Sequence, residues 1–132
     1  LPGVDISADI TIMMELLLEI NKRFGLSEEQ LNQMDFERKK VLLVIISSVG
    51  NELVGKNITA SLVRSVLRKA SNKIAAKQAS KFIPLAGQAV SAGISFAAMR
   101  YLGNNHIEQC YQIALQYMSS IDTRFTGDVI DI

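Results

Sequence analysis

The stretch "FGLSEEQLNQMDFERKKVLLVIISSVG", residues 24–50, sets the fold class because it contains several helix boundaries in close succession. Ser27 followed by Gln30 has the spacing of a capping box, in which two side chains satisfy backbone N–H groups at a helix N-terminus. The pattern predicts a short helix that ends at about residue 34.

Three further residues of this stretch separate the short helix from its neighbours. Gly25 is placed to end the preceding helix in a left-handed conformation, and Asp35 can cap the helix that follows. Gly50 then ends that helix. We therefore expect one helix over residues 4–24 and another over residues 36–50, because apolar residues recur at helical spacing in the first and fill the second.

Downstream of residue 50 we expect three more helical segments. A long basic helix should occupy residues 58–82, with Asn57 or Thr59 as its N-cap, and Pro84 should end it. A helix rich in small residues follows and should stop at Gly103.

A last helix should begin at Asn105, with Glu108 at its third position, and end at about residue 121. The predicted fold is thus all-α, a single-domain bundle of five or six helices over residues 1–121. The tail, residues 122–132, has no helical period and is expected to be disordered, a strand or a linker.

The composition supports a packed helical domain. The chain has 132 residues, of which 48% are hydrophobic but only 6% aromatic, and it contains two prolines. Cys110 is its only cysteine, which excludes an internal disulfide and suits a reducing, cytoplasmic setting. We expect no signal peptide, and the start at Leu1 rather than Met suggests a piece of a longer protein.

Charge is unevenly distributed along the chain. Residues 1–52 carry nine acids and five bases, a net charge of −4, whereas residues 53–107 carry eight bases and no acid. Residues 108–132 carry four acids and one base, a net charge of −3. The middle third of the chain is therefore a basic block between acidic flanks.

Residues 41–63 contain a G-x-x-x-x-G-K sequence, formed by Gly50, Gly55 and Lys56, that resembles a phosphate-binding loop. The hydroxyl residue that would bind Mg²⁺ is replaced by Asn57, and no parallel sheet is predicted around it. We therefore interpret this stretch as a helix C-cap and a loop, and we disfavour a nucleotide-dependent enzyme.

Residues 82–99 form an uncharged run of 18, the minimum length for a membrane-spanning helix. Pro84 and few large aliphatic residues make insertion unfavourable. Ala89, Gly93 and Ala97 form a smooth stripe for close helix packing, so we favour a buried central helix of the bundle over a membrane span.

The basic helix is the candidate binding element. On a helical wheel Lys73 and Lys77 fall inside its apolar arc, so either the face turns near Ile74 or the lysine stems snorkel at an apolar edge. Such a helix suits an anionic membrane surface, and the alternative is a solvated face or one paired with an acidic patch of the same bundle. We expect no nucleic-acid partner, because few aromatic residues are available for stacking. The candidate membrane- or partner-binding residues are Arg64, Arg68, Lys69, Lys73, Lys77 and Lys81.

His106 and Cys110 are spaced as a possible pair of metal ligands on one helix face. A zinc site needs more ligands, and the chain contains no second His or Cys. No arrangement typical of a catalytic nucleophile or carboxylate pair stands out. We expect no metal, cofactor or catalytic residue in this chain.

Several motifs resemble the C-terminal helical domain of the immunity-related GTPases, which are interferon-inducible, dynamin-like proteins of innate immunity. The opening PG-x-x-x-x-x-D (Pro2, Gly3, Asp9), "RFGL" at residues 23–26 and "IPLAG…GISFA" at residues 83–97 carry the likeness. It extends over most of residues 1–121 but is less distinctive in the middle of the chain.

The resemblance implies a helical domain that packs against its own GTPase domain and associates with membranes, while GTP and Mg²⁺ bind elsewhere in the parent. It implies no catalytic residue in this part. The family's domain also uses N-terminal helices that are not in this sequence, which implies an exposed apolar surface and a possible homo-oligomer.

We therefore expect a regulatory, membrane-associating domain of such a GTPase, active in cell-autonomous defence and peripherally attached to a cytoplasmic membrane surface. The fragment itself would not be an enzyme. The alternative is a non-enzymatic helical scaffold whose basic block docks an acidic partner or a neighbouring domain.

Overall fold

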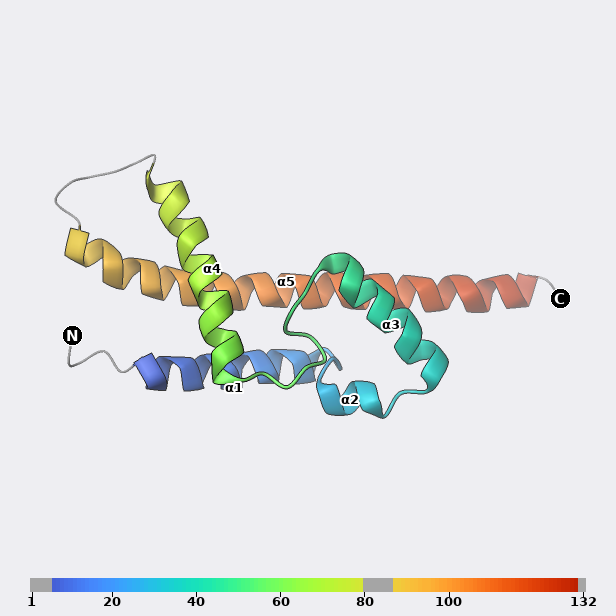
Figure 1. Ribbon diagram of the computed structural model, residues 1–132. Coiled ribbons are helices and arrows are strands. Elements are labelled where there is room, and N and C mark those ends of the chain that lie inside the picture. Colours follow the sequence, from blue (N-terminus) through green and yellow to red (C-terminus); the bar gives the residue numbers. More distant parts are fainter. Residues whose placement is uncertain (1–5, 80–86, 131–132) are drawn as a thin grey trace. The chain divides into compact units, whose positions relative to one another are not determined.

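The computed structural model describes the backbone of residues 6–130 except 80–86, and the side chains of residues 9–76 and 96–121. Within this part the chain is all-α, as predicted, and contains five helices and no strand (Figure 1). The helices are α1 (Ile6–Arg23), α2 (Glu28–Asn32), α3 (Phe36–Val49), α4 (Ala60–Ala79) and α5 (Gly87–Ile130).

The described chain divides into two compact units, and α1 and α5 each contribute to both. Unit 1 contains α1 up to Leu17, all of α4, and α5 up to His106. Unit 2 contains the rest of α1 from Leu18, then α2, α3 and the loop to Asn57, and α5 from Ile107 onward.

Unit 2 has an aliphatic core to which all of its helices contribute. Leu31 of α2, Leu42 of α3 and Ile113 of α5 are each buried almost completely. Burying one such side chain stabilises a fold by about 1.5–3 kcal/mol, so this cluster holds the short helices in place. The core residues are Ile20, Leu26, Leu31, Leu42, Ile45, Ile46, Val54, Cys110 and Ile113.

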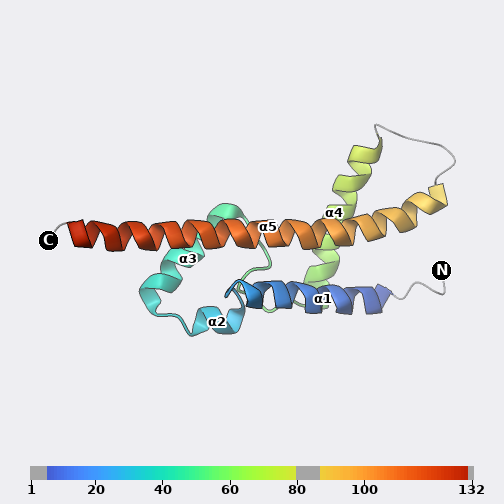
Figure 2. The same cartoon turned by 180° about the vertical axis from the view of Figure 1, so that it is seen from behind.

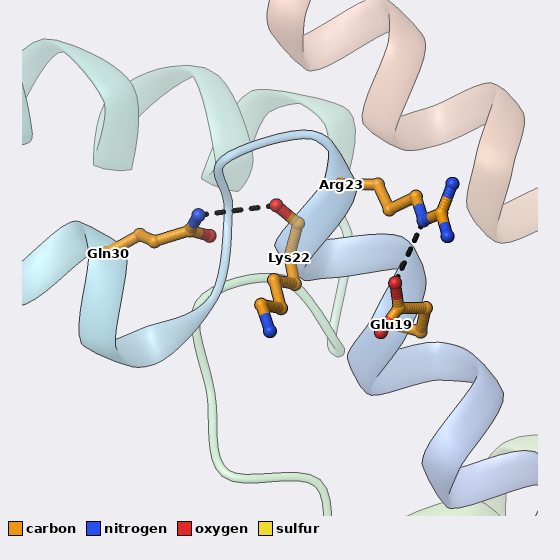
Figure 3. Close-up of polar contacts among 4 residues, drawn as sticks. All are labelled: Glu19, Lys22, Arg23 and Gln30. Atoms are coloured by element: carbon orange, nitrogen blue, oxygen red, sulfur yellow. Dashed lines mark hydrogen bonds and ion pairs between the residues drawn. The ribbon is translucent and has the colours of Figure 1, made fainter.

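The junction of α1 and α2 forms as the sequence predicts. Gly25 has φ +74°, and the side chain of Ser27 accepts a hydrogen bond from the Gln30 backbone while Gln30 Oε1 accepts one from the Ser27 backbone. Gln30 Nε2 also donates to the carbonyl of Lys22 at 3.2 Å, beside the exposed Arg23–Glu19 ion pair (Figure 3). The side-chain amide of Gln30 therefore hydrogen-bonds the backbone at both the start of α2 and the end of α1.

The ends of α3 also match the prediction. Asp35 accepts a hydrogen bond from the backbone N–H of Arg38 at 3.3 Å, and Gly50 is left-handed with φ +78°. Figure 1 and Figure 2 show α3 beside the C-terminal half of α5, against which its buried face packs.

In unit 1, Thr59 rather than Asn57 caps the basic helix. Thr59 Oγ1 accepts a hydrogen bond from the backbone N–H of Leu62 at 3.2 Å. One side of α4 is buried through Val63, Val66 and Ala70.

The predicted break at Gly103 is wrong, because α5 is one continuous helix across it. Gly103 is buried, and a Cβ atom built on it would meet Cδ2 of Leu16 at 3.6 Å, an ordinary van der Waals distance. The position lies inside a helix that packs against α1, and the glycine does not end that helix. Asn105 accordingly lies inside α5 and is not an N-cap.

The predicted absence of helix after residue 121 is also wrong, since the backbone of α5 is helical through Ile130. The break predicted at Pro84 lies outside the described residues, as do the side chains of Ala89 and Gly93. Just beyond them Phe96 is 69% exposed, whereas Ala98 is buried. Among the described residues, none of the helices has a stretch long and apolar enough to cross a bilayer.

Candidate functional site: the basic face of α4

Four of the six predicted binding residues lie exposed on α4. They are Arg64, Arg68, Lys69 and Lys73. Lys77 lies in the last part of α4 with its side chain outside the described set, and Lys81 lies outside the described residues altogether.

The four bases form two neighbouring pairs on the exposed side of α4. Arg64 and Arg68 are one turn apart, as are Lys69 and Lys73, and the pairs lie roughly 140° apart around the helix at about 100° per residue. The surface between them carries small or polar side chains, and α4 contains no acidic residue. This arrangement presents cationic groups over about half of the helix circumference.

Lys73 falls inside the predicted apolar arc of α4 and is nevertheless exposed, while Ile74 beside it is half-buried. These exposures fit both alternatives that the sequence left open, a face that turns near Ile74 and a lysine stem that snorkels at an apolar edge.

The apolar side of α4 is already occupied within unit 1. Val63 is 0% exposed and Val66 is 8% exposed, so neither contributes to an outward surface. Insertion of α4 into a bilayer would have to remove these side chains from the core, at about 1.5–3 kcal/mol each. The exposed face can bind anions through charge without that cost.

In the loop that resembles a phosphate-binding motif, the side chain of Asn51 accepts hydrogen bonds from the loop's own backbone. Oδ1 of the buried Asn51 accepts hydrogen bonds from the backbone N–H groups of Leu53 and Val54, both at 2.7 Å. Asn51 Nδ2 donates to the side chain of Gln109 on α5. The N–H of Gly55 donates to the carbonyl of Leu26 at 2.9 Å.

These bonds occupy three of the backbone N–H groups that a phosphate cradle would use. A phosphate-binding loop needs backbone N–H groups that point at the ligand. Here the N–H groups of Leu53, Val54 and Gly55 all have acceptors within unit 2. The interpretation of Gly50 as a helix C-cap followed by a loop is confirmed.

A second buried amide connects this loop to α1 and α5. Asn21 is 0% exposed, and its Nδ2 donates to the carbonyl of Leu53 at 2.9 Å. Its Oδ1 accepts from the thiol of Cys110 at 3.8 Å. Sequence reasoning missed this role, although Asn21 interrupts the apolar stripe of α1 between Leu17 and Phe24, at helical spacing from both.

His106 and Cys110 are both buried side chains of α5. Burial raises the pKa of Cys110 to about 12, so the sulfur is a thiol at neutral pH and a poor nucleophile. Burial lowers the pKa of His106 to about 4, so its imidazole is neutral. Among the residues described, no three His, Cys, Asp or Glu side chains lie close enough together to hold a metal ion.

The buried histidine predicts a stability loss in mild acid. The pKa of His106 is about 4 in the folded chain and about 6.5 when the chain unfolds, so its contribution is complete above pH 6.5 and is lost as pH falls toward 4. From pH 8 to pH 5 the loss amounts to about 2 kcal/mol of unfolding free energy. Urea unfolding at both pH values, beside His106→Gln, measures it. Equal pH dependence in the two proteins would contradict this assignment.

Comparison with known proteins found no match to this chain among protein-family models, curated proteins or solved structures.

Proposed function

We propose that this chain is a non-catalytic helical module that attaches to an anionic membrane surface through the basic face of α4. The observation that carries the proposal is the exposure of Arg64, Arg68, Lys69 and Lys73 on a helix without an acidic residue. Anionic lipid headgroups offer a dense array of the opposite charge.

Attachment is electrostatic rather than insertive. Each base near an anionic leaflet contributes about 1 kcal/mol, so four contribute on the order of 4 kcal/mol, about a thousandfold in partitioning. The Debye length is about 8 Å at physiological ionic strength, so this attraction weakens strongly as salt is added. The buried apolar side of α4 supports this mode.

We further propose that the module is the helical domain of an immunity-related GTPase acting in cell-autonomous defence. The motifs at residues 2–9, 23–26 and 83–97 support this assignment. The transcript provides the test: a parent GTPase requires G-x-x-x-x-G-K-[ST] after a strand in the coding sequence before Leu1. An upstream coding sequence without that motif would contradict the assignment, whatever α4 binds.

The second candidate is a scaffold whose basic face docks an acidic partner or a neighbouring domain of the parent. It is favoured by the same exposed charges, because a face of mostly charged, polar and small groups suits a salt-sensitive protein contact as well as a headgroup layer.

Vesicle flotation should separate the two candidates. We expect the chain to float with phosphatidylserine-containing vesicles but not with pure phosphatidylcholine, and to lose binding as salt rises. Replacing the four exposed bases of α4 should abolish flotation. The variant carries Arg64→Ala, Arg68→Ala, Lys69→Ala and Lys73→Ala.

A matched control variant loses the same number of positive charges, but from four exposed bases of unit 2. It should still float, because its α4 is unchanged. If the control also fails to float, the binding depends on the net charge of the chain and not on the basic face of α4. If the native chain does not float, the acidic-partner candidate replaces the membrane candidate. The control carries Lys22→Ala, Arg23→Ala, Arg38→Ala and Lys56→Ala.

A further inference from the structure

Unit 2 carries an apolar ridge on the outer side of α5 that has no partner among the described residues. Its four side chains are Ile107 (45% exposed), Tyr111 (49%), Leu115 (44%) and Met118 (61%). They recur every three or four residues and lie about 125° around the helix from the buried Cys110 and Ile113. Eleven residues separate the ends of the ridge, which makes it about 17 Å long.

A charged group lies beside this α5 ridge. Glu108 is exposed and precedes Tyr111 by three residues and Leu115 by seven, so it lies at the ridge's edge. Its carboxylate accepts a hydrogen bond from Nε2 of Gln112 at 3.1 Å, which places one acidic group along the apolar surface.

Unit 2 also carries an open apolar groove of about 690 Å³ lined by α3 and α5, and Figure 1 and Figure 2 show α3 crossing α5 at an angle. Val41, Val44 and Ile45 form its apolar wall, and Val44 is 64% exposed. A neighbouring hollow of about 480 Å³ shares Val44 and adds Leu43, which is 46% exposed. The groove residues are Glu37, Lys40, Val41, Val44, Ile45, Ser119 and Ser120.

The groove has a basic group where the ridge has an acidic one. Lys40 lines both hollows, and Glu37 lies one turn before it on α3. The convex ridge carries the Glu108 carboxylate, and the concave groove carries the Lys40 ammonium group. The two apolar surfaces therefore match when Glu108 lies next to Lys40 and away from Glu37. The charges thus select one direction of docking.

We propose that the α5 ridge of one copy of this chain lies in the α3–α5 groove of a second copy, with Glu108 facing the second copy's Lys40. The ridge and the groove are separate but adjoining surfaces of α5, because Ser119 lies about 40° and Ser120 about 140° around the helix from Leu115 at about 100° per residue. The contact is therefore heterologous, and each copy keeps one unused surface for the next.

The size of the ridge makes this assembly weak and reversible. Four side chains that are about half exposed offer on the order of 400 Å² per copy, an ordinary size for the largest patch of a monomer. Two such surfaces bury less than the roughly 1,200 Å² of a stable complex. We expect the average mass of the full chain to rise continuously with concentration instead of settling at a dimer.

Sedimentation equilibrium of the full chain from micromolar to millimolar concentration tests this. For the native protein the average mass should rise above the 14.5 kDa of one chain. For Met118→Lys and for Val44→Lys it should remain at 14.5 kDa. Gln33→Lys adds the same charge at the exposed end of α2, outside both the ridge and the groove, and should assemble like the native protein. Circular dichroism confirms that each variant is folded.

Mixing the two blocked variants gives the decisive result. Met118→Lys keeps its groove and Val44→Lys keeps its ridge, so an equimolar mixture should form a dimer and stop there. In the native chain, Lys40→Glu or Glu108→Lys alone should weaken assembly, and the double variant should restore it. A native chain that remains monomeric, a mixture that does not dimerise, or a double variant weaker than both single ones would overturn the proposal.

Discussion

Replacing Asn51 with alanine should lower the free energy of unfolding by about 4 kcal/mol, because it leaves two buried N–H groups without acceptors. Asn51 Oδ1 accepts from the backbone of Leu53 and of Val54, both at 2.7 Å, and these two residues are 4% and 2% exposed. Each unsatisfied buried donor costs about 1–3 kcal/mol. The contact with Gln109 is lost as well.

Asn51→Asp is the matched control for this prediction. Aspartate keeps the acceptor oxygens, and the amide of Gln109 can turn to donate to it, so we expect a loss within about 1 kcal/mol of the native value at pH 7. Urea unfolding followed by circular dichroism measures both variants. Equal losses for alanine and aspartate would show that the acceptor oxygen is not what stabilises the loop.

Replacing Gly55 with alanine should cost about 3 kcal/mol, the second-largest effect. Gly55 has φ +70°, and an alanine Cβ there would lie 2.5 Å from Cδ2 of Leu31, which is 2% exposed. The left-handed backbone costs a residue with a Cβ about 1–2 kcal/mol, and overpacking of the core adds about 1–3 kcal/mol.

Gly25→Ala separates these two contributions. Gly25 has φ +74°, but nothing lies within 4 Å of an added Cβ, so only the backbone cost of about 1–2 kcal/mol applies. Thermal or urea unfolding of both variants gives the comparison. If Gly25→Ala destabilises the chain as much as Gly55→Ala, the contact with Leu31 plays no part.

The helix ends that could be predicted are those that nearby residues determine. The capping box of Ser27 and Gln30, the Asp35 cap and the left-handed Gly50 all depend on contacts within four residues, so the sequence order alone contains them. Gly103 was misinterpreted because the helix around it continues and packs against Leu16 of α1, 87 residues away in sequence. A glycine that ends a helix and one inside a buried helix look alike in the sequence.

The candidate surface was predictable in part, for a similar reason. The exposure of Arg64, Arg68 and Lys69 follows from the helical period, whereas Lys73 is exposed although the same period places it inside the apolar arc. The role of Asn21 could not be predicted, because its partners Leu53 and Cys110 are brought to it only by folding. Asn51 is different: its bonds to Leu53 and Val54 span two and three residues and are local, and only its contact with Gln109 depends on folding.

The reaction of Cys110 with alkylating reagents reports how often the core of unit 2 opens. It is the chain's only thiol, it is 0% exposed beneath Asn21, and its pKa is raised to about 12. Alkylating reagents attack the thiolate, so modification has to wait until this part of the core opens to water. The labelling rate of the native protein therefore counts the openings of unit 2 without any introduced probe, while unit 1, which has no cysteine, contributes no signal.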